Sequence, residues 1–232
     1  MKLIGEVMRD LFGLVYPNVC VTCGKPLPRG CLYLCPGCLY RLPRTHFHKD
    51  RDNPLAMTFW GRVPIEHAAA WFQYTKGSLY PRLIYVMKYS GRRDIARVMG
   101  RFYAAELKDS PLDETHLIVP IPLHPRKERK RGYNQSEWIG RGLSEGLDKP
   151  LECNLLRRTV NTRTQTKKSR LERWKNVENV FRVAKPDALQ HKHVLLVDDV
   201  VTTGATLESA TVTLLQIPGV RVSIAALAYA NF

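Results

Sequence analysis

The chain has 232 residues, of which 44% are hydrophobic, and it carries a formal net charge of +15. This length accommodates one full domain and a small additional one, since domains typically span about 100–200 residues. The excess of cations favours a polyanionic partner, either nucleic acid or a multiply phosphorylated substrate, although a basic surface without such a partner is the simpler alternative. No run approaches the roughly 18 apolar residues of a membrane span, so we expect no membrane insertion.

The first segment predicts an amphipathic helix over residues 2–15, because apolar side chains recur there at helical spacing. Glu6, Arg9 and Asp10 interrupt the apolar pattern, whereas a signal peptide needs an uninterrupted apolar centre. We therefore expect no signal peptide and a cytoplasmic protein.

A cysteine-rich segment follows, with five of the six cysteines in one short stretch. Two Cys-x2-Cys hooks offer four thiolates, which suits a structural tetrahedral Zn²⁺ site. Disulfides are the alternative, and a cytoplasmic location argues against them. Cys31 lacks an x2 partner, so we interpret it as a free thiol. The expected zinc ligands are Cys20, Cys23, Cys35 and Cys38.

The next segment predicts a strand over residues 68–74 and two helices over 79–88 and 95–107. Lys88 lies at the end of the first helix, shortly before Gly91. Its ammonium group has two readings that the sequence leaves open. It either contacts a ligand phosphate or stays solvated at a helix C-terminus, where cations are favoured.

A basic loop is predicted after a strand over residues 117–123. Residues 124–132 hold five cations, Arg126 and Arg131 among them, against one anion. The guanidinium group of arginine binds phosphate through two parallel hydrogen bonds, so this loop suits a pyrophosphate group. A solvated loop and an arm that binds nucleic acid are the alternatives. A helix over residues 133–147 follows.

The segment over residues 155–185 predicts two short strands, at 155–158 and 177–183, joined by a polar connection. Residues 159–169 have almost no apolar anchors, which is typical of a mobile lid. Ser169-x2-Glu172 is a possible capping box for a short helix after it. A lid that closes over a reactive phosphosugar excludes water from it.

The most informative stretch covers residues 194–206. Four apolar residues predict a buried strand, two aspartates follow where that strand is expected to end, and a loop of small and hydroxyl residues precedes a helix over 207–216. Backbone N–H groups of such a loop surround a phosphate, and Gly204 permits the tight turn. The carboxylates of Asp198 and Asp199 suit sugar hydroxyls or a hydrated Mg²⁺.

A Walker-type nucleotide site is the competing interpretation of the apolar strand with its aspartates. It requires a G-x-x-x-x-G-K-[ST] loop, and Gly24-Lys25 is followed by Pro26. We therefore favour a phosphate site beside a sugar site. A last strand over residues 220–228 completes an alternation of strands and helices, which predicts an α/β fold with a mostly parallel sheet flanked by helices.

The motifs resemble those of a known family. Residues 194–206 are similar to the phosphoribosyl pyrophosphate (PRPP) motif of type I phosphoribosyltransferases. Together with the four cysteines and three further motifs in the same order, nearly the whole chain resembles the ComF family. Those motifs are Pro120-x-Pro122-Leu123-His124, Arg131-Gly132-Tyr133-Asn134-Gln135-Ser136 and Arg173-x2-Asn176-Val177.

The resemblance implies a type I phosphoribosyltransferase-like domain over residues 61–232 and a small four-cysteine zinc-ribbon domain over residues 1–60. Asp198 and Asp199, the candidate catalytic residues, would hold the ribose hydroxyls, and the loop after Leu123 would meet the pyrophosphate. The cysteine domain would bind Zn²⁺ and help to contact single-stranded DNA or a DNA-uptake helicase. The candidate PRPP-binding residues are Thr202, Thr203, Gly204, Ala205, Thr206, Arg126, Arg131 and Lys88.

The function expected from these features is Mg²⁺-dependent PRPP binding in DNA uptake or natural competence, with transfer of the phosphoribosyl group to an unidentified acceptor. Two alternatives remain. The protein is a competence factor that binds single-stranded DNA, or it senses a phosphoribosyl ligand without performing chemistry.

Overall fold

The computed structural model describes residues 18–159 and 180–230. The predicted helix over residues 2–15, nearly all of the predicted lid, the possible capping box and the Arg173-x2-Asn176-Val177 motif lie outside these ranges. In chain order the elements are α2 (Pro36–Tyr40), η1 (Phe47–Lys49), α3 (Pro54–Met57), β1 (Ala68–Gln73), α4 (Pro81–Tyr89), α5 (Arg93–Leu107), β2 (Leu117–Pro120), α6 (Pro125–Arg131), α7 (Gln135–Leu147), β3 (Leu156–Arg158), β4 (Phe181–Val183), η2 (Pro186–Leu189), β5 (His193–Val201), α9 (Ala205–Leu215) and β6 (Arg221–Tyr229).

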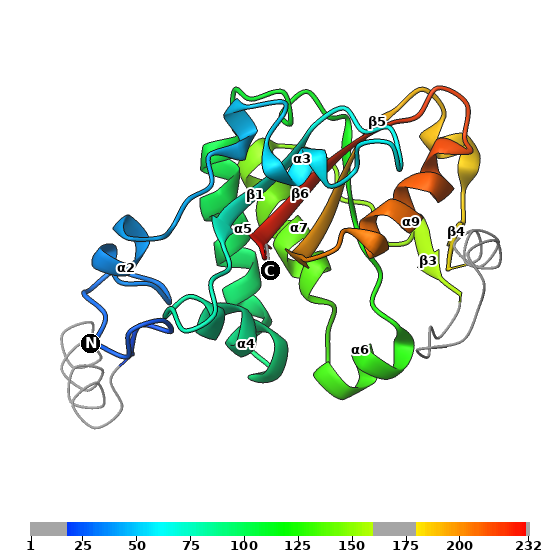
Figure 1. Ribbon diagram of the computed structural model, residues 1–232. Coiled ribbons are helices and arrows are strands. Elements are labelled where there is room, and N and C mark those ends of the chain that lie inside the picture. The colour runs from blue at the N-terminus through cyan, green and yellow to red at the C-terminus, as the bar shows by residue number, and fades with distance from the viewer. Residues whose placement is uncertain (1–17, 160–179, 231–232) are drawn as a thin grey trace, which may run out of the picture.

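The central sheet has the strand order β1-β6-β5-β2, and each neighbouring pair is parallel. Figure 1 shows helices on both sides of this sheet. The predicted mostly parallel sheet flanked by helices is therefore confirmed. The strands β3 and β4 form a separate antiparallel pair.

Side chains of β5 alternate between two apolar cores, one on each face of the sheet. Leu195 and Val197 belong to one cluster, which also contains apolar residues of α4, α5 and α7. Val194 and Leu196 belong to the other, with residues of α3 and α9. Because alternate residues of a strand face opposite sides, β5 is buried on both faces, as its continuous apolar run predicts.

The helices α5 and α7 pack closely through glycines. A Cβ atom built on Gly100 would lie 2.2 Å from the backbone oxygen of Ile139, and one on Gly142 would lie 2.0 Å from that of Arg97. Only residues without a side chain fit at both positions. This close packing fixes α7, and with it Ser136 at the start of the helix, against the sheet.

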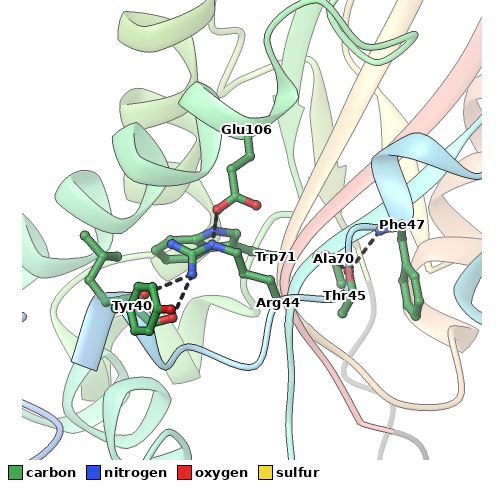
Figure 2. A network of polar contacts seen from close by, with 8 residues as sticks. Tyr40, Arg44, Thr45, Phe47, Ala70, Trp71 and Glu106 are labelled. Atoms are coloured by element: carbon green, nitrogen blue, oxygen red, sulfur yellow. Dashed lines mark hydrogen bonds and ion pairs between the residues drawn. The ribbon is translucent and has the colours of Figure 1, made fainter. Parts of the chain in front are cut away.

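The cysteine-rich segment is packed against the same core as the sheet. Cys20 and Cys38 share an apolar cluster with Trp71. Figure 2 shows the polar contacts that accompany this packing: Glu106 accepts hydrogen bonds from Arg44 Nε at 2.5 Å and from Trp71 Nε1 at 2.8 Å. The predicted domain boundary near residue 60 remains a prediction.

Two sequence-based predictions need correction. Residues 124–132 were expected to form a loop, but α6 occupies Pro125–Arg131, because Pro125 begins the helix, the His124 ring nitrogen accepts from the Arg126 N–H, and Gly132 ends it at a φ of 82°. The strand β5 was expected to end before the aspartates, but it continues through both to Val201, because it stays paired in parallel register with β6 up to that residue. In the described part of the chain, every helix is too short or too polar to cross a bilayer.

Candidate functional site

The two aspartates lie near the carboxyl end of β5, where ligands of parallel α/β sheets bind. Asp198 Oδ1 accepts hydrogen bonds from Ser136 Oγ at 2.9 Å and from the Asp199 N–H at 2.8 Å. Ser136 belongs to α7 and is buried. The helix α7 therefore orients one carboxylate, which leaves less conformational freedom to lose when a ligand is bound.

The environment of Asp198 disfavours its charged form. Burial and the nearby charge of Asp199 raise the pKa of Asp198 from 3.8 to about 7, despite opposing contributions from the Asp199 N–H, Ser136 and Lys88. Two carboxyl groups that share one site resist simultaneous ionisation. A cation, or hydrogen-bond donors such as the hydroxyl groups of a ligand, would therefore stabilise the ionised form of the pair.

Lys88 is brought directly to this pair. Its Nζ lies 3.0 Å from Asp199 Oδ2, and the side chain is 22% exposed. Of the two readings left open by the sequence, full solvation therefore does not describe the ligand-free protein. Since the ammonium group neutralises only one carboxylate, the aspartate pair keeps capacity for further donors.

The loop after β5 has the geometry of an anion site at the start of α9. Gly204 adopts the left-handed conformation at a φ of 73° and precedes the first helical residue, Ala205. A small hollow at this point is lined by Asp198, Val200, Val201 and residues 202–207. The N-terminus of a helix attracts anions through its free N–H groups and its dipole.

Arg62 is a supporting residue that the sequence did not indicate. Its Nη1 donates to the Thr203 carbonyl oxygen at 3.0 Å and to that of Thr58 at 3.0 Å, and its guanidinium pairs with Glu208 on α9. Phe59 packs on the same loop, since a Cβ atom on Gly204 would lie 3.1 Å from its ring. The segment after α3 thus holds the loop in place from a distant part of the sequence.

We predict that Gly204→Ala destabilises the protein more than Gly77→Ala. Both glycines have a positive φ, of 73° and 82°, and only Gly204 has neighbours within 4 Å of an added Cβ atom. Each change should cost about 1–2 kcal/mol of backbone strain, and Gly204→Ala should cost at least about 1 kcal/mol more through overpacking against Phe59. Urea denaturation measures both. Equal losses would show that Phe59 does not constrain the loop.

The basic helix α6 follows β2, the neighbour of β5 in the sheet. Pro120, which ends β2, pairs in parallel register with Val197, so α6 and the loop after β5 leave the same edge of the sheet. Arg126 is exposed. Arg131 donates from Nη1 to Gln135 Oε1 at 2.8 Å. Arg126 and Arg131 thus belong to a segment that starts at the same end of the sheet as the aspartates. This segment is a helix and not the predicted loop.

The four predicted zinc ligands are together. The Sγ atoms of Cys20, Cys23, Cys35 and Cys38 all lie within 4.8 Å of one another, and those of Cys23 and Cys35 are 3.8 Å apart. Tetrahedral Zn²⁺ with Zn–S bonds of about 2.3 Å requires S···S distances of about 3.8 Å, so this donor set fits zinc. Cys31 is outside the cluster, as expected.

Comparisons with known proteins add relatives across most of the chain. It is 32% identical over 212 residues to the DNA utilization protein YhgH of Escherichia coli, covering 84% of this chain and 89% of that protein. It is 34% identical over 130 residues to competence protein F of Haemophilus influenzae, covering 54% and 57%. With competence protein ComFC of Bacillus subtilis it shares 29% over 214 residues, covering 90% and 82%. No family model matches the chain.

Among solved structures, the chain aligns with glutamine PRPP amidotransferase from Bacillus subtilis at 20% identity and a TM-score of 0.42, covering 60% of this chain and 30% of that one. An adenine phosphoribosyltransferase from Leishmania donovani aligns at 13% identity and a TM-score of 0.38, covering 62% and 68%. Structural similarities at these identities and TM-scores carry no argument about function, so the function is inferred from the residues of the site.

Proposed function

Because the chain belongs to the ComF family of competence and DNA utilization proteins, we propose that it binds PRPP together with Mg²⁺ at the carboxyl ends of β5 and β2. The observation that carries this proposal is the aspartate pair beside the Gly204 loop at the start of α9. Carboxylates suit ribose hydroxyls, and the helix start suits a phosphate. One ligand that offers both groups is a phosphorylated ribose.

Each part of PRPP then has a place. Asp198 and Asp199 hold the ribose 2′ and 3′ hydroxyls, and α6 meets the pyrophosphate through Arg126 and Arg131. Mg²⁺, when bound with the ligand, would neutralise part of the pyrophosphate charge. The residues that would surround the 5′-phosphate are Thr202, Thr203, Gly204, Ala205 and Thr206.

Lys88 has two partners in this proposal. In the ligand-free protein it pairs with Asp199 at 3.0 Å. When the ribose hydroxyls donate to the aspartates instead, its ammonium group is free to turn toward the pyrophosphate or its metal ion. It would thus exchange an internal ion pair for a ligand contact.

Phosphoribosyl transfer is the chemistry that this arrangement supports. A nucleophile bonds to C1 of the ribose while the bond from C1 to the pyrophosphate oxygen breaks, and pyrophosphate leaves with the electron pair. The protein contributes by positioning the ligand and stabilising the leaving group's charge. PRPP-dependent pyrophosphate release, with and without candidate acceptors, tests the enzyme. Binding without release would favour a non-catalytic sensor of a phosphoribosyl ligand.

A role in handling single-stranded DNA is the second candidate, and it fits the +15 charge and the exposed cations of α6. We propose that it acts in the cytoplasm during DNA uptake, together with a DNA-uptake helicase. Binding of a single-stranded oligonucleotide that weakens as salt rises is the expected result. Binding that is absent or independent of salt would contradict it.

We predict that Asp198→Asn stabilises the ligand-free protein in a pH-dependent way. The folded state raises the pKa of Asp198 from 3.8 to about 7, so wild type keeps a proton there that the unfolded chain has released. Between about pH 4 and about pH 7 this carboxyl group is ionised in the unfolded chain and protonated in the folded protein. The free energy of unfolding of wild type therefore falls as the pH rises, and the variant avoids this loss. Thermal denaturation across this range should show a growing advantage of the variant. A difference that does not change with pH would contradict the assignment.

A further inference from the structure

An exposed pair of aromatic rings lies next to the candidate site. Tyr85 and Tyr89, one helical turn apart on α4, are 63% and 59% exposed. Their ring centroids are 4.9 Å apart at an angle of 44°. Scattered single apolar residues are ordinary on a protein surface, whereas adjacent exposed ones more often mark an interaction site. Two adjacent rings left in solvent therefore present an aromatic surface that the packing of the fold does not explain.

This surface continues into the basic helix. The Arg131 guanidinium lies over the Tyr89 ring, 5.7 Å from its centroid. The helix α6 has no buried residue, and Figure 1 shows it on the same side of the molecule as α4. Arg131 thus joins α6 to the two rings, and the helix carries five cations that the core does not need. They are Arg126, Lys127, Arg129, Lys130 and Arg131.

The helix α4 connects this surface to the aspartate pair. Lys88, which precedes Tyr89, points to Asp199, while Tyr85 and Tyr89 point to solvent. Because consecutive residues of a helix face different directions, α4 directs Lys88 toward the site and directs Tyr85 and Tyr89 toward the outer surface. A polymer bound on the outer surface would pass the mouth of the site.

We propose that Tyr85, Tyr89 and α6 form a binding surface for single-stranded nucleic acid, in which bases stack on the two rings and phosphates pair with Lys127, Arg129 and Lys130. Exposed aromatic rings interleaved with cations match the flat faces and the charged backbone of a single strand. In a duplex, the base faces are covered by neighbouring base pairs. The proposal rests on the DNA-handling part of the proposed function and not on PRPP binding.

Fluorescence anisotropy with a labelled oligothymidylate tests the stacking surface. Each stacked base contributes about 1–3 kcal/mol by alanine substitution, so Tyr85→Ala with Tyr89→Ala should weaken binding at least tenfold. Tyr85→Phe with Tyr89→Phe keeps the rings and should stay within about twofold of wild type. Trp60→Ala removes a ring that is 57% exposed outside α4 and α6, and it should bind like wild type. Circular dichroism checks that each variant is folded.

The cations of α6 are tested separately, through the salt dependence of binding. Each phosphate contact with a single strand contributes about −0.7 to the slope of log K against log salt. Arg129→Gln with Lys130→Gln should therefore make the slope less steep by about 1.4. A tyrosine double-alanine variant that binds as tightly as wild type overturns this inference while DNA handling stands. A wild-type protein that does not bind the oligonucleotide overturns both, and PRPP binding is judged independently by calorimetry.

Discussion

Replacing Asp198 and Asp199 together by asparagine is expected to abolish PRPP binding, with a loss of affinity of at least about a hundredfold. Hydrogen bonds to charged groups contribute about 1.5–3 kcal/mol each, and 1.4 kcal/mol corresponds to a factor of ten in affinity. At pH 8, above the Asp198 pKa of about 7, the double variant removes two charged acceptors and releases Lys88 from its partner at 3.0 Å. Isothermal titration calorimetry with PRPP and Mg²⁺ measures the effect.

The matched control for this experiment is Asp187→Asn. Asp187 is an exposed aspartate of η2 that hydrogen-bonds the Gln190 side chain, outside the candidate site. Its replacement should leave PRPP affinity within about twofold of wild type. Unchanged affinity in the double variant would show that the aspartates do not hold the ribose, whatever else the Gly204 loop binds.

Cys38→Ser is expected to remove the bound zinc and to lower the melting temperature by at least about 5 °C. Structural zinc supplies a large part of the folding free energy of small four-cysteine units, and a change of 1 kcal/mol shifts the melting temperature of a chain of this size by about 2–4 °C. Cys38 is 1% exposed and packs in the cluster that contains Trp71. Loss of the metal should therefore loosen the main core as well.

Cys31→Ser provides the comparison, because Cys31 lies in the same segment and outside the group of four. That variant should retain about one zinc per chain and the wild-type melting temperature. Metal analysis by mass spectrometry and differential scanning calorimetry give the two readings. A purified, reduced wild-type protein without zinc would remove the proposed metal site.

The sequence was sufficient for features that depend on local pattern. The run before Asp198 alternates between two cores, which is why it reads as continuously apolar and predicts a doubly buried strand. The two Cys-x2-Cys hooks predicted four sulfurs in one place because each hook is a short turn, and their Sγ atoms lie within 4.8 Å of one another.

Features that depend on distant residues could not be predicted in this way. Arg62 supports Thr203 across 141 positions of sequence, and no spacing rule connects them. The pairing of Lys88 with Asp199 depends on how α4 packs against the sheet. The helix α6 was missed because its composition suggests a solvated loop, whereas its ends carry specific capping interactions at His124 and Gly132.

The central claim is that the site at the carboxyl ends of β5 and β2 binds PRPP. Calorimetric titration of PRPP into the wild-type protein, with Mg²⁺ and again with EDTA, tests it most directly. We predict saturable binding at one site per chain with Mg²⁺, competition by pyrophosphate, and much weaker binding with EDTA. A titration without saturable heat in Mg²⁺, at protein and ligand concentrations that reveal millimolar affinity, would contradict the claim.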